Sequence, residues 1–122
     1  MTSPLLLEGK TILLLEDDYY LASDACEILK DAGAKVVGPF GRGEDALDAL
    51  NRCQVDAGVI DINLGTGPEF QVAEALQERG IRFIFATGYG EGVVPPALSG
   101  VHRLEKPFKA SELLSAMSAA LD

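Results

Sequence analysis

The stretch Val59-Ile60-Asp61-Ile62-Asn63 places an aspartate where an apolar run of strand length gives way to a loop. Apolar residues 57–60 precede Asp61, and residues 64–68 follow it with two glycines and a proline, which favour a loop. In open α/β sheets, ligands and phosphates bind at the carboxyl ends of the strands. Asp61 is therefore a candidate site residue, although taken alone it fits a loop-starting or helix-capping role equally well.

Length and composition indicate one globular domain over residues 1–122, with no room for an output domain. The net charge of -9 and the lack of a basic run argue against a nucleic-acid-binding surface, and such an acidic chain suits divalent cations. The longest apolar run is too short to cross a membrane, and the first residues lack a basic secretory start. We therefore expect a cytoplasmic protein without a membrane partner.

The cysteines and the histidine exclude several kinds of site. Cys26 and Cys53 lie in helical patterns without CxxC spacing, so we expect both to pack as small apolar residues rather than to form a disulfide or bind a metal. His102 is the single histidine. A metal site built from several histidines is excluded, and the sequence does not group a histidine with a nucleophile.

Strand-length apolar runs alternate with helical patterns along the chain. The expected strands are residues 11–15, 35–38, 57–61, 81–86 and 101–105. Asp18 is placed to cap the first helix, Pro68 fits the first turn of the third, and Gly33 and Gly80 are placed to end the first and third helices. Five β-α units predict a flavodoxin-like α/β fold: a doubly wound parallel sheet of order 2-1-3-4-5, with helices on both faces. Glycines and prolines between residues 88 and 96 predict a short or irregular fourth helix.

This strand order brings polar groups from four strand ends to one edge of the sheet. The converging residues are Glu16, Asp17, Asp61, Thr87 and Lys106. Two like charges about 4 Å apart repel by roughly 4 kcal/mol at an effective dielectric near 20, so clustered carboxylates need a cation. Carboxylates with a loop carbonyl and waters form the oxygen shell that Mg²⁺ prefers, and Asn63 is placed to offer its main-chain carbonyl.

The same residues suit phosphoryl transfer. A carboxylate nucleophile such as Asp61 can accept a phosphoryl group, while neighbouring cations neutralise the phosphoryl oxygens. Lys106 would supply such a cation, and the Thr87 hydroxyl could donate to one oxygen of the attached group. Each residue has a structural alternative: a surface lysine, a strand-end hydroxyl, or a charge pair at a helix start. Matching groups at four separate strand ends favour a site over coincidence.

As a set, these residues resemble the receiver domain of two-component response regulators. The likeness covers nearly the whole chain and rests on the apolar strand into Glu16-Asp17, on Asp61, on Thr87 and on Lys106-Pro107-Phe108. The resemblance implies a phosphoacceptor in a phosphorelay, with at most slow self-dephosphorylation, rather than an enzyme. Asp61 would take a phosphoryl group from a histidine kinase or a histidine phosphotransfer protein.

The resemblance also implies a metal site and a backbone feature. Asp17, Asp61 and the Asn63 carbonyl would hold Mg²⁺ with support from Glu16. The peptide bond between Lys106 and Pro107 would be cis.

Two features depart from the usual pattern of this family. An aromatic residue usually stands three positions before the lysine, where this chain has Arg103. Phe85-Ala86-Thr87-Gly88-Tyr89 resembles the FATGUY subgroup of receivers, whose fourth helix is often short or mobile. We hypothesise that phosphorylation rearranges residues 87–99, with Tyr89 serving in place of the missing aromatic.

Three functions remain open at this point. The leading one is a stand-alone phosphoacceptor switch with a downstream protein partner. The second is a small Mg²⁺-dependent phosphohydrolase with an aspartyl nucleophile, and the third is a degenerate receiver that only binds a partner. Tyr19 and Tyr20 follow the acid pair, and we expect them to take part in helix packing near the site rather than in catalysis.

Overall fold

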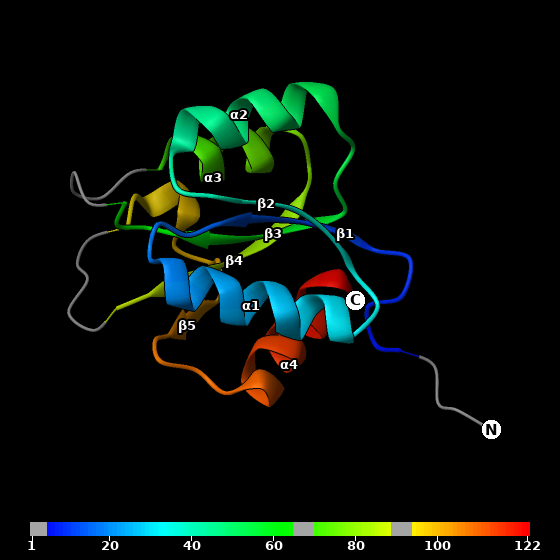
Figure 1. The fold of residues 1–122 in the computed structure, drawn as a ribbon. Coiled ribbons are helices and arrows are strands. Elements are labelled where there is room, and N and C mark those ends of the chain that lie inside the picture. The colour runs from blue at the N-terminus through cyan, green and yellow to red at the C-terminus, as the bar shows by residue number, and fades with distance from the viewer. Residues whose placement is uncertain (1–4, 65–69, 89–93) are drawn as a thin grey trace.

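A computed structural model describes residues 5–64, 70–88 and 94–122 of the chain. In these residues five parallel strands form one sheet in the predicted order, β2-β1-β3-β4-β5 (Figure 1). The strands are β1 (Thr11–Leu15), β2 (Lys35–Phe40), β3 (Ala57–Asp61), β4 (Arg82–Thr87) and β5 (Arg103–Glu105). The predicted fold class is confirmed.

Three strands differ in extent from the prediction. β4 is shifted by one residue, since it spans Arg82–Thr87 rather than residues 81–86. β2 continues past Gly38 to Phe40. Gly38 makes this possible because it adopts a φ of +112°, which favours glycine. It also lies so close to β1 that a Cβ atom at this position would be 2.7 Å from the Leu14 carbonyl oxygen. β5 begins at Arg103 rather than at residue 101. The amide of Val101 instead donates to the carbonyl of Leu98, which closes the turn before the strand.

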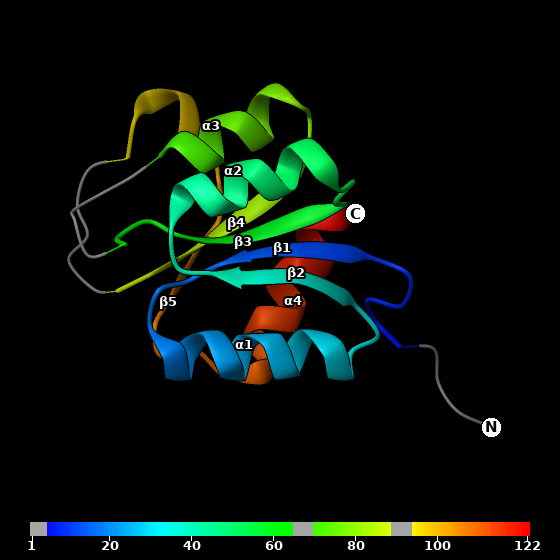
Figure 2. The ribbon, with the colours of Figure 1, turned by 45° about the horizontal axis from the view of Figure 1, so that its top comes forward.

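Helices cover both faces of the sheet. They are α1 (Tyr19–Asp31), α2 (Gly43–Arg52), α3 (Gln71–Glu78) and α4 (Ala110–Leu121), with a short 3-10 helix, η1 (Pro96–Leu98), between β4 and β5. α1 and α4 lie on one face, and α2, α3 and η1 lie on the other (Figure 2). The short η1 is the irregular fourth helix that the glycines and prolines predict. Pro68, expected in the first turn of α3, lies outside the described residues.

The sequence signals at the helix ends act as expected. Asp18 is the N-cap of α1, and its Oδ1 accepts hydrogen bonds from the amides of Tyr20 at 3.0 Å and Leu21 at 3.1 Å. Gly33, with a φ of +96°, follows the end of α1, and its amide donates to the Lys30 carbonyl. The first turn of α1 is therefore fixed directly after the acid pair.

Alternation along the central strands divides the core into two apolar clusters. Ile12 and Leu14 of β1 pack with α1 and α4, whereas Leu13 and Leu15 pack with α2 and α3. All four side chains are at most 2% exposed, as expected for a strand covered on both faces. The sheet is thus a rigid support for the residues that follow its strand ends.

The two cysteines are both free, but they differ in burial. Cys26 is partly buried against the cluster under α1 and α4, as predicted. Cys53 is exposed, so its predicted packing is wrong. The residue is the C-cap of α2, and its extended backbone (φ -127°, ψ 146°) takes it off the apolar face that Ala46, Ala49 and Leu50 form.

Hydrogen bonds of the Asp56 and Arg82 side chains connect neighbouring elements at the amino edge of the sheet. Asp56 Oδ2 accepts from the Thr11 amide at 2.8 Å, and the Asp56 amide donates to the Thr11 carbonyl at 2.7 Å. Arg82 Nη1 donates to the carbonyls of Ala120 at 3.0 Å and Asp122 at 3.2 Å, which joins the end of α4 to the start of β4.

Within the described residues, no helix combines the length and apolar character needed to cross a membrane.

Candidate functional site

Three polar side chains are buried in residues 5–64, 70–88 and 94–122, and all three lie at the carboxyl edge of the sheet. Glu16, Asp61 and Thr87 are 6%, 3% and 5% exposed. They follow or close β1, β3 and β4, which are adjacent in the sheet. Burial of ionisable groups without partners is costly, so their contacts decide what this edge can do.

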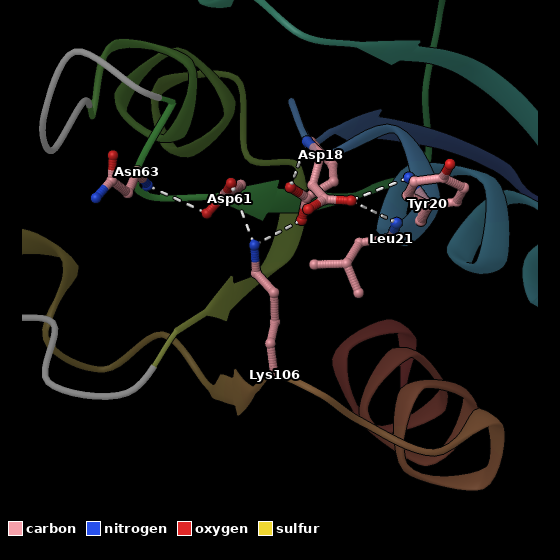
Figure 3. A network of polar contacts seen from close by, with 7 residues as sticks. Asp18, Tyr20, Leu21, Asp61, Asn63 and Lys106 are labelled. Atoms are coloured by element: carbon pink, nitrogen blue, oxygen red, sulfur yellow. Dashed lines mark hydrogen bonds and ion pairs between the residues drawn. The ribbon is translucent and has the colours of Figure 1, made fainter.

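Lys106 lies between the two buried carboxylates. Its Nζ donates to Glu16 Oε1 at 2.7 Å and lies 3.3 Å from Asp61 Oδ2 (Figure 3). The Lys106 amide donates to the Thr87 carbonyl at 2.7 Å, which fixes the start of the side chain next to β4. The lysine side chain is 13% exposed, so this is a largely buried ion pair rather than a surface contact. The sequence alternative of a surface lysine is excluded.

Glu16 connects three parts of the edge. Its Oε1 accepts from Lys106, and its Oε2 accepts from the Asp18 amide at 3.1 Å. Its own amide donates to the Phe40 carbonyl at the end of β2 at 2.8 Å. Because Asp18 in turn caps α1, Glu16 links the lysine to the start of that helix. Sequence reasoning did not predict this connection.

Asp61 is the most deeply buried carboxylate of the site. Its Oδ1 accepts from the Asn63 amide at 3.1 Å. Burial, and then the charge of Glu16, raises the pKa of Asp61 from 3.8 to about 7, against the opposing effects of Lys106 and of the Asn63 amide. Burial acts to lower the pKa of Lys106, but its hydrogen bond to Glu16 and the negative charges outweigh burial and raise that pKa. The lysine is therefore cationic at neutral pH.

The acid cluster suits a divalent cation. Glu16, Asp17 and Asp61 each offer a carboxylate oxygen, and these oxygens lie within 4.8 Å of one another. Glu16 and Asp61 are buried, whereas Asp17 is exposed and opens the cluster to solvent. Among the described residues, the Lys106 ammonium contacts two of these three carboxylates, those of Glu16 and Asp61, so the cluster keeps an excess of negative charge. Hard oxygen donors with one open side fit Mg²⁺.

The other predicted site residues are placed as follows. The Asn63 contact to Asp61 is through its amide, so the use of its carbonyl as a metal ligand stays a prediction. Arg103 is exposed on the edge strand β5 and pairs in register with Phe85. Tyr89 lies outside the described residues. The Lys106-Pro107 peptide bond is cis, as the resemblance implies.

Tyr19 and Tyr20 do not pack as expected. They are 76% and 78% exposed, among the most exposed large hydrophobic side chains of the described chain. Helical side chains lean toward the helix N-terminus, and α1 begins at the carboxyl edge. The first-turn side chains therefore lean past the sheet into solvent, while Ala22, Ala25 and Leu29 form the buried face.

Comparisons with curated proteins reveal relatives over most of the chain. No family model matches it. The chain is 30% identical over 118 residues to the transcriptional regulatory protein TdiR of Thauera aromatica, and 29% identical over 116 residues to nodulation protein W of Bradyrhizobium diazoefficiens. These alignments cover 93% and 91% of this chain but 52% and 51% of the two proteins. The chain thus spans about half the length of the curated relatives it matches.

Two solved structures match the chain over nearly their full length. The solution structure of SdrG from Sphingomonas melonis Fr1 has a TM-score of 0.82 and 31% identity, and the match covers 99% of this chain and all of that one. The crystal structure of a response regulator receiver protein from Sinorhizobium medicae has a TM-score of 0.79 and 32% identity, with 94% and 96% of the two chains covered.

The fold and site together define a class of signalling protein: a five-stranded parallel α/β domain with an acid cluster and a lysine at its carboxyl edge. The chain belongs to the response regulator receiver family. Membership implies a phosphoacceptor role in signalling.

Proposed function

We propose that the chain is a phosphoacceptor switch in which Asp61 receives a phosphoryl group from the phosphohistidine of a histidine kinase or histidine phosphotransfer protein. The observation that carries this proposal is the position of Asp61. Its buried carboxylate stands 3.3 Å from the Lys106 ammonium and within the acid cluster of Glu16 and Asp17. A nucleophile, a fixed cation and a metal-binding set therefore converge at one strand end.

The proposed transfer forms one bond and breaks one. A carboxylate oxygen of Asp61 attacks phosphorus, the P–N bond of the phosphohistidine breaks, and the imidazole nitrogen keeps the electron pair. The product is an acyl phosphate on Asp61. Asp61 must be ionised to attack, and Lys106 favours this form because its ammonium faces Oδ2. The same ammonium then lies next to the negative phosphoryl oxygens.

Glu16, Asp17 and Asp61 would hold Mg²⁺, together with the Asn63 carbonyl, and the ion would neutralise charge on the carboxylates and on the phosphoryl oxygens. The Thr87 hydroxyl, buried at the end of β4, would donate to one oxygen of the attached phosphoryl group. This assigns Thr87 a role only in the phosphorylated state.

The region after β4 is the proposed responding element. Residues 87–99 would rearrange on phosphorylation, and Tyr89 and Arg103 are candidates for the switch. η1 in this region is attached to the neighbouring helix because Gln77 Nε2 of α3 donates to the Ala97 carbonyl at 2.9 Å. The sequence from Phe85 to Tyr89 and the short η1 support assignment to the FATGUY subgroup. A downstream protein would read the change.

The test is the intact mass of the protein after incubation with acetyl phosphate, with and without Mg²⁺. We expect one phosphoryl adduct on the wild type in the presence of Mg²⁺ and none on Asp61→Asn. Asp48→Asn is the matched control, since it makes the same chemical change on the exposed side of α2. An adduct that persists in Asp61→Asn would overturn the assignment of the acceptor. No adduct on the wild type would favour the degenerate, partner-binding receiver.

A further inference from the structure

The Lys106 ammonium is held more closely by Glu16 than by Asp61. Its Nζ lies 2.7 Å from Glu16 Oε1 and 3.3 Å from Asp61 Oδ2. A lysine ammonium stands at the end of a flexible four-carbon stem, so the stem itself does not fix its position. The shorter contact does this instead. A shift of the Glu16 carboxylate would therefore move Nζ relative to Asp61.

The Glu16 carboxylate is oriented in turn by residue 18. Its second oxygen, Oε2, accepts a hydrogen bond from the Asp18 amide at 3.1 Å. Because Oε2 is bound on this side, Oε1 is directed to the lysine. The Glu16 backbone is anchored as well, since its amide donates to the Phe40 carbonyl at 2.8 Å. The direction of the Glu16 carboxylate thus depends on where the Asp18 amide points.

The first turn of α1 sets the direction of the Asp18 amide. Asp18 Oδ1 accepts hydrogen bonds from the amides of Tyr20 at 3.0 Å and Leu21 at 3.1 Å (Figure 3). The Asp18 carbonyl accepts another from the Ala22 amide at 2.8 Å. The side chain and the carbonyl of one residue are therefore both bound to the helix, and a rotation of this residue would break these bonds. The start of α1 thereby fixes the amide that holds Glu16.

We infer that Asp18 is a positioning residue for phosphoryl transfer: by capping α1 it orients Glu16, and through Glu16 it holds the Lys106 ammonium beside Asp61. The inference rests on the proposed function and adds a residue that acts through another side chain rather than on the reacting atoms. Such positioning matters because a misplacement of about 1 Å can lower a rate about 100-fold. The effect of Asp18 comes from its capping hydrogen bonds and not from its charge.

The experiment separates the capping bonds from the charge. Asp18→Ala removes the side-chain acceptor, whereas Asp18→Asn removes the charge and keeps an oxygen for the amides of Tyr20 and Leu21. Phosphoramidate with Mg²⁺ is the donor, so recognition of a donor protein plays no part, and intact mass gives the rate of phosphorylation. We expect the rate to fall about tenfold in Asp18→Ala and to stay near the wild-type rate in Asp18→Asn.

A second measurement follows the lysine itself in the metal-free protein. The Lys106 side chain is 13% exposed and hydrogen-bonded, and an ammonium in such a place exchanges its protons with water more slowly than a free one. It can therefore give an NMR signal, which the Lys106→Met variant identifies by its absence. We expect this signal in the wild type and in Asp18→Asn, and its loss or shift in Asp18→Ala. A purely structural cap would leave the signal unchanged.

Glu112→Ala is the matched control, because it removes a side-chain acceptor at the start of another helix. Glu112 Oε1 accepts from the amide of Lys109, the N-cap of α4, at 2.7 Å. This variant should keep both the rate and the Lys106 signal, and urea unfolding compares its stability with that of Asp18→Ala. If Asp18→Ala does not fold, Asp18→Gly takes its place. Glycine is a better N-cap than alanine, but it has no side chain to fix residue 18.

Several results would overturn the inference. A wild-type rate in Asp18→Ala would show that the cap does not affect the transfer, and a lower rate with an unchanged Lys106 signal would show that Asp18 acts by another route. An equal loss in Asp18→Asn would assign the effect to the charge, and an equal loss in Glu112→Ala would assign it to general destabilisation. If phosphoramidate fails on the wild type, the proposed function fails instead, and the Lys106 signal still tests the connection from Asp18.

Discussion

The two edges of the sheet use the same residue type in opposite ways. At the amino edge, Asp56 is exposed, and it exchanges hydrogen bonds with the backbone of Thr11. At the carboxyl edge, Asp61 is buried beside Glu16, and a single lysine contacts both carboxylates. The first aspartate is satisfied within the fold. The second is kept in a place where its charge is costly.

This difference distinguishes residues that stabilise the fold from residues that lower its stability but serve a function. At the amino edge, the side chains of Asp56 and Arg82 form hydrogen bonds with main-chain groups, and these bonds stabilise the folded chain without a ligand. At the carboxyl edge, the described residues include a cluster of three carboxylates, two of which contact the Lys106 ammonium, and a bound cation would relieve the repulsion in this cluster. The free energy of unfolding of variants at each edge, measured without metal, can therefore test this difference.

The largest effect on stability is expected for Lys106→Met. Removing the ammonium leaves Glu16 and Asp61 buried without a cation, so the free energy of unfolding should fall by about 3 kcal/mol near pH 8 without metal. Urea unfolding of the variant and of the wild type measures this change. Lys35→Met, on the exposed side of β2, is the control and should change stability little. Equal stability of Lys106→Met and wild type would show that the comparison of the edges is wrong.

The pH dependence of stability tests whether the charge of Asp61 is costly in the folded protein. Because the folded-state pKa of Asp61 is about 7 and its usual value is 3.8, the folded protein binds more protons than the unfolded chain between these values. Stability should therefore fall as pH rises through this window, with Asp61 contributing a slope of at most about 1.4 kcal/mol per pH unit. Asp61→Asn should lose this contribution. Urea unfolding of both proteins without metal, from about pH 5 to about pH 8, gives the difference.

Other titrating groups cancel in that difference, because both proteins share them. A wild type and an Asp61→Asn variant with parallel pH profiles would contradict the raised pKa of Asp61.

The smallest effect is expected at the amino edge. Asp56→Ala removes the hydrogen bond to the Thr11 amide and should cost about 1 kcal/mol of stability, without affecting phosphorylation by acetyl phosphate. Urea unfolding and intact mass measure the two outcomes on the same sample. Asp48→Ala controls for loss of an exposed carboxylate. A slower phosphorylation of Asp56→Ala would mean that the two edges are coupled.

The positions of the site residues were predictable because a strand end is visible in the sequence as an abrupt change of polarity. Glu16 and Asp61 each follow or close an apolar run, and parallel strands bring such ends to one edge. Asp18 was predictable as a cap for the same kind of reason, since cap residues are read from local spacing. The parallel sheet with helices on both faces then followed from the alternation of strands and helices.

The contacts between these residues were not predictable, because they depend on rotamers and on how far each helix extends past the sheet. For example, one carboxylate oxygen of Glu16 accepts a hydrogen bond from Lys106 and the other from the Asp18 amide, and the sequence does not indicate either contact. The exposure of Tyr19 and Tyr20 depends on where α1 starts relative to the sheet edge, which helical periodicity does not report. The exposure of Cys53 likewise follows from the backbone angle at one residue after α2.

The attachment of α4 by Arg82 has a practical consequence for binding measurements. Its hydrogen bonds hold the carbonyls of Ala120 and Asp122 next to the start of β4. The C-terminus therefore lies at the opposite end of the sheet from the point where β3 ends (Figure 1). In a protein with Cys26→Ala and Cys53→Ser, which removes both native free thiols, coupling to a biosensor chip through a thiol at position 122 would hold every molecule in one orientation. The carboxyl edge would then face the flowing solution, and immobilisation would not obstruct an incoming kinase.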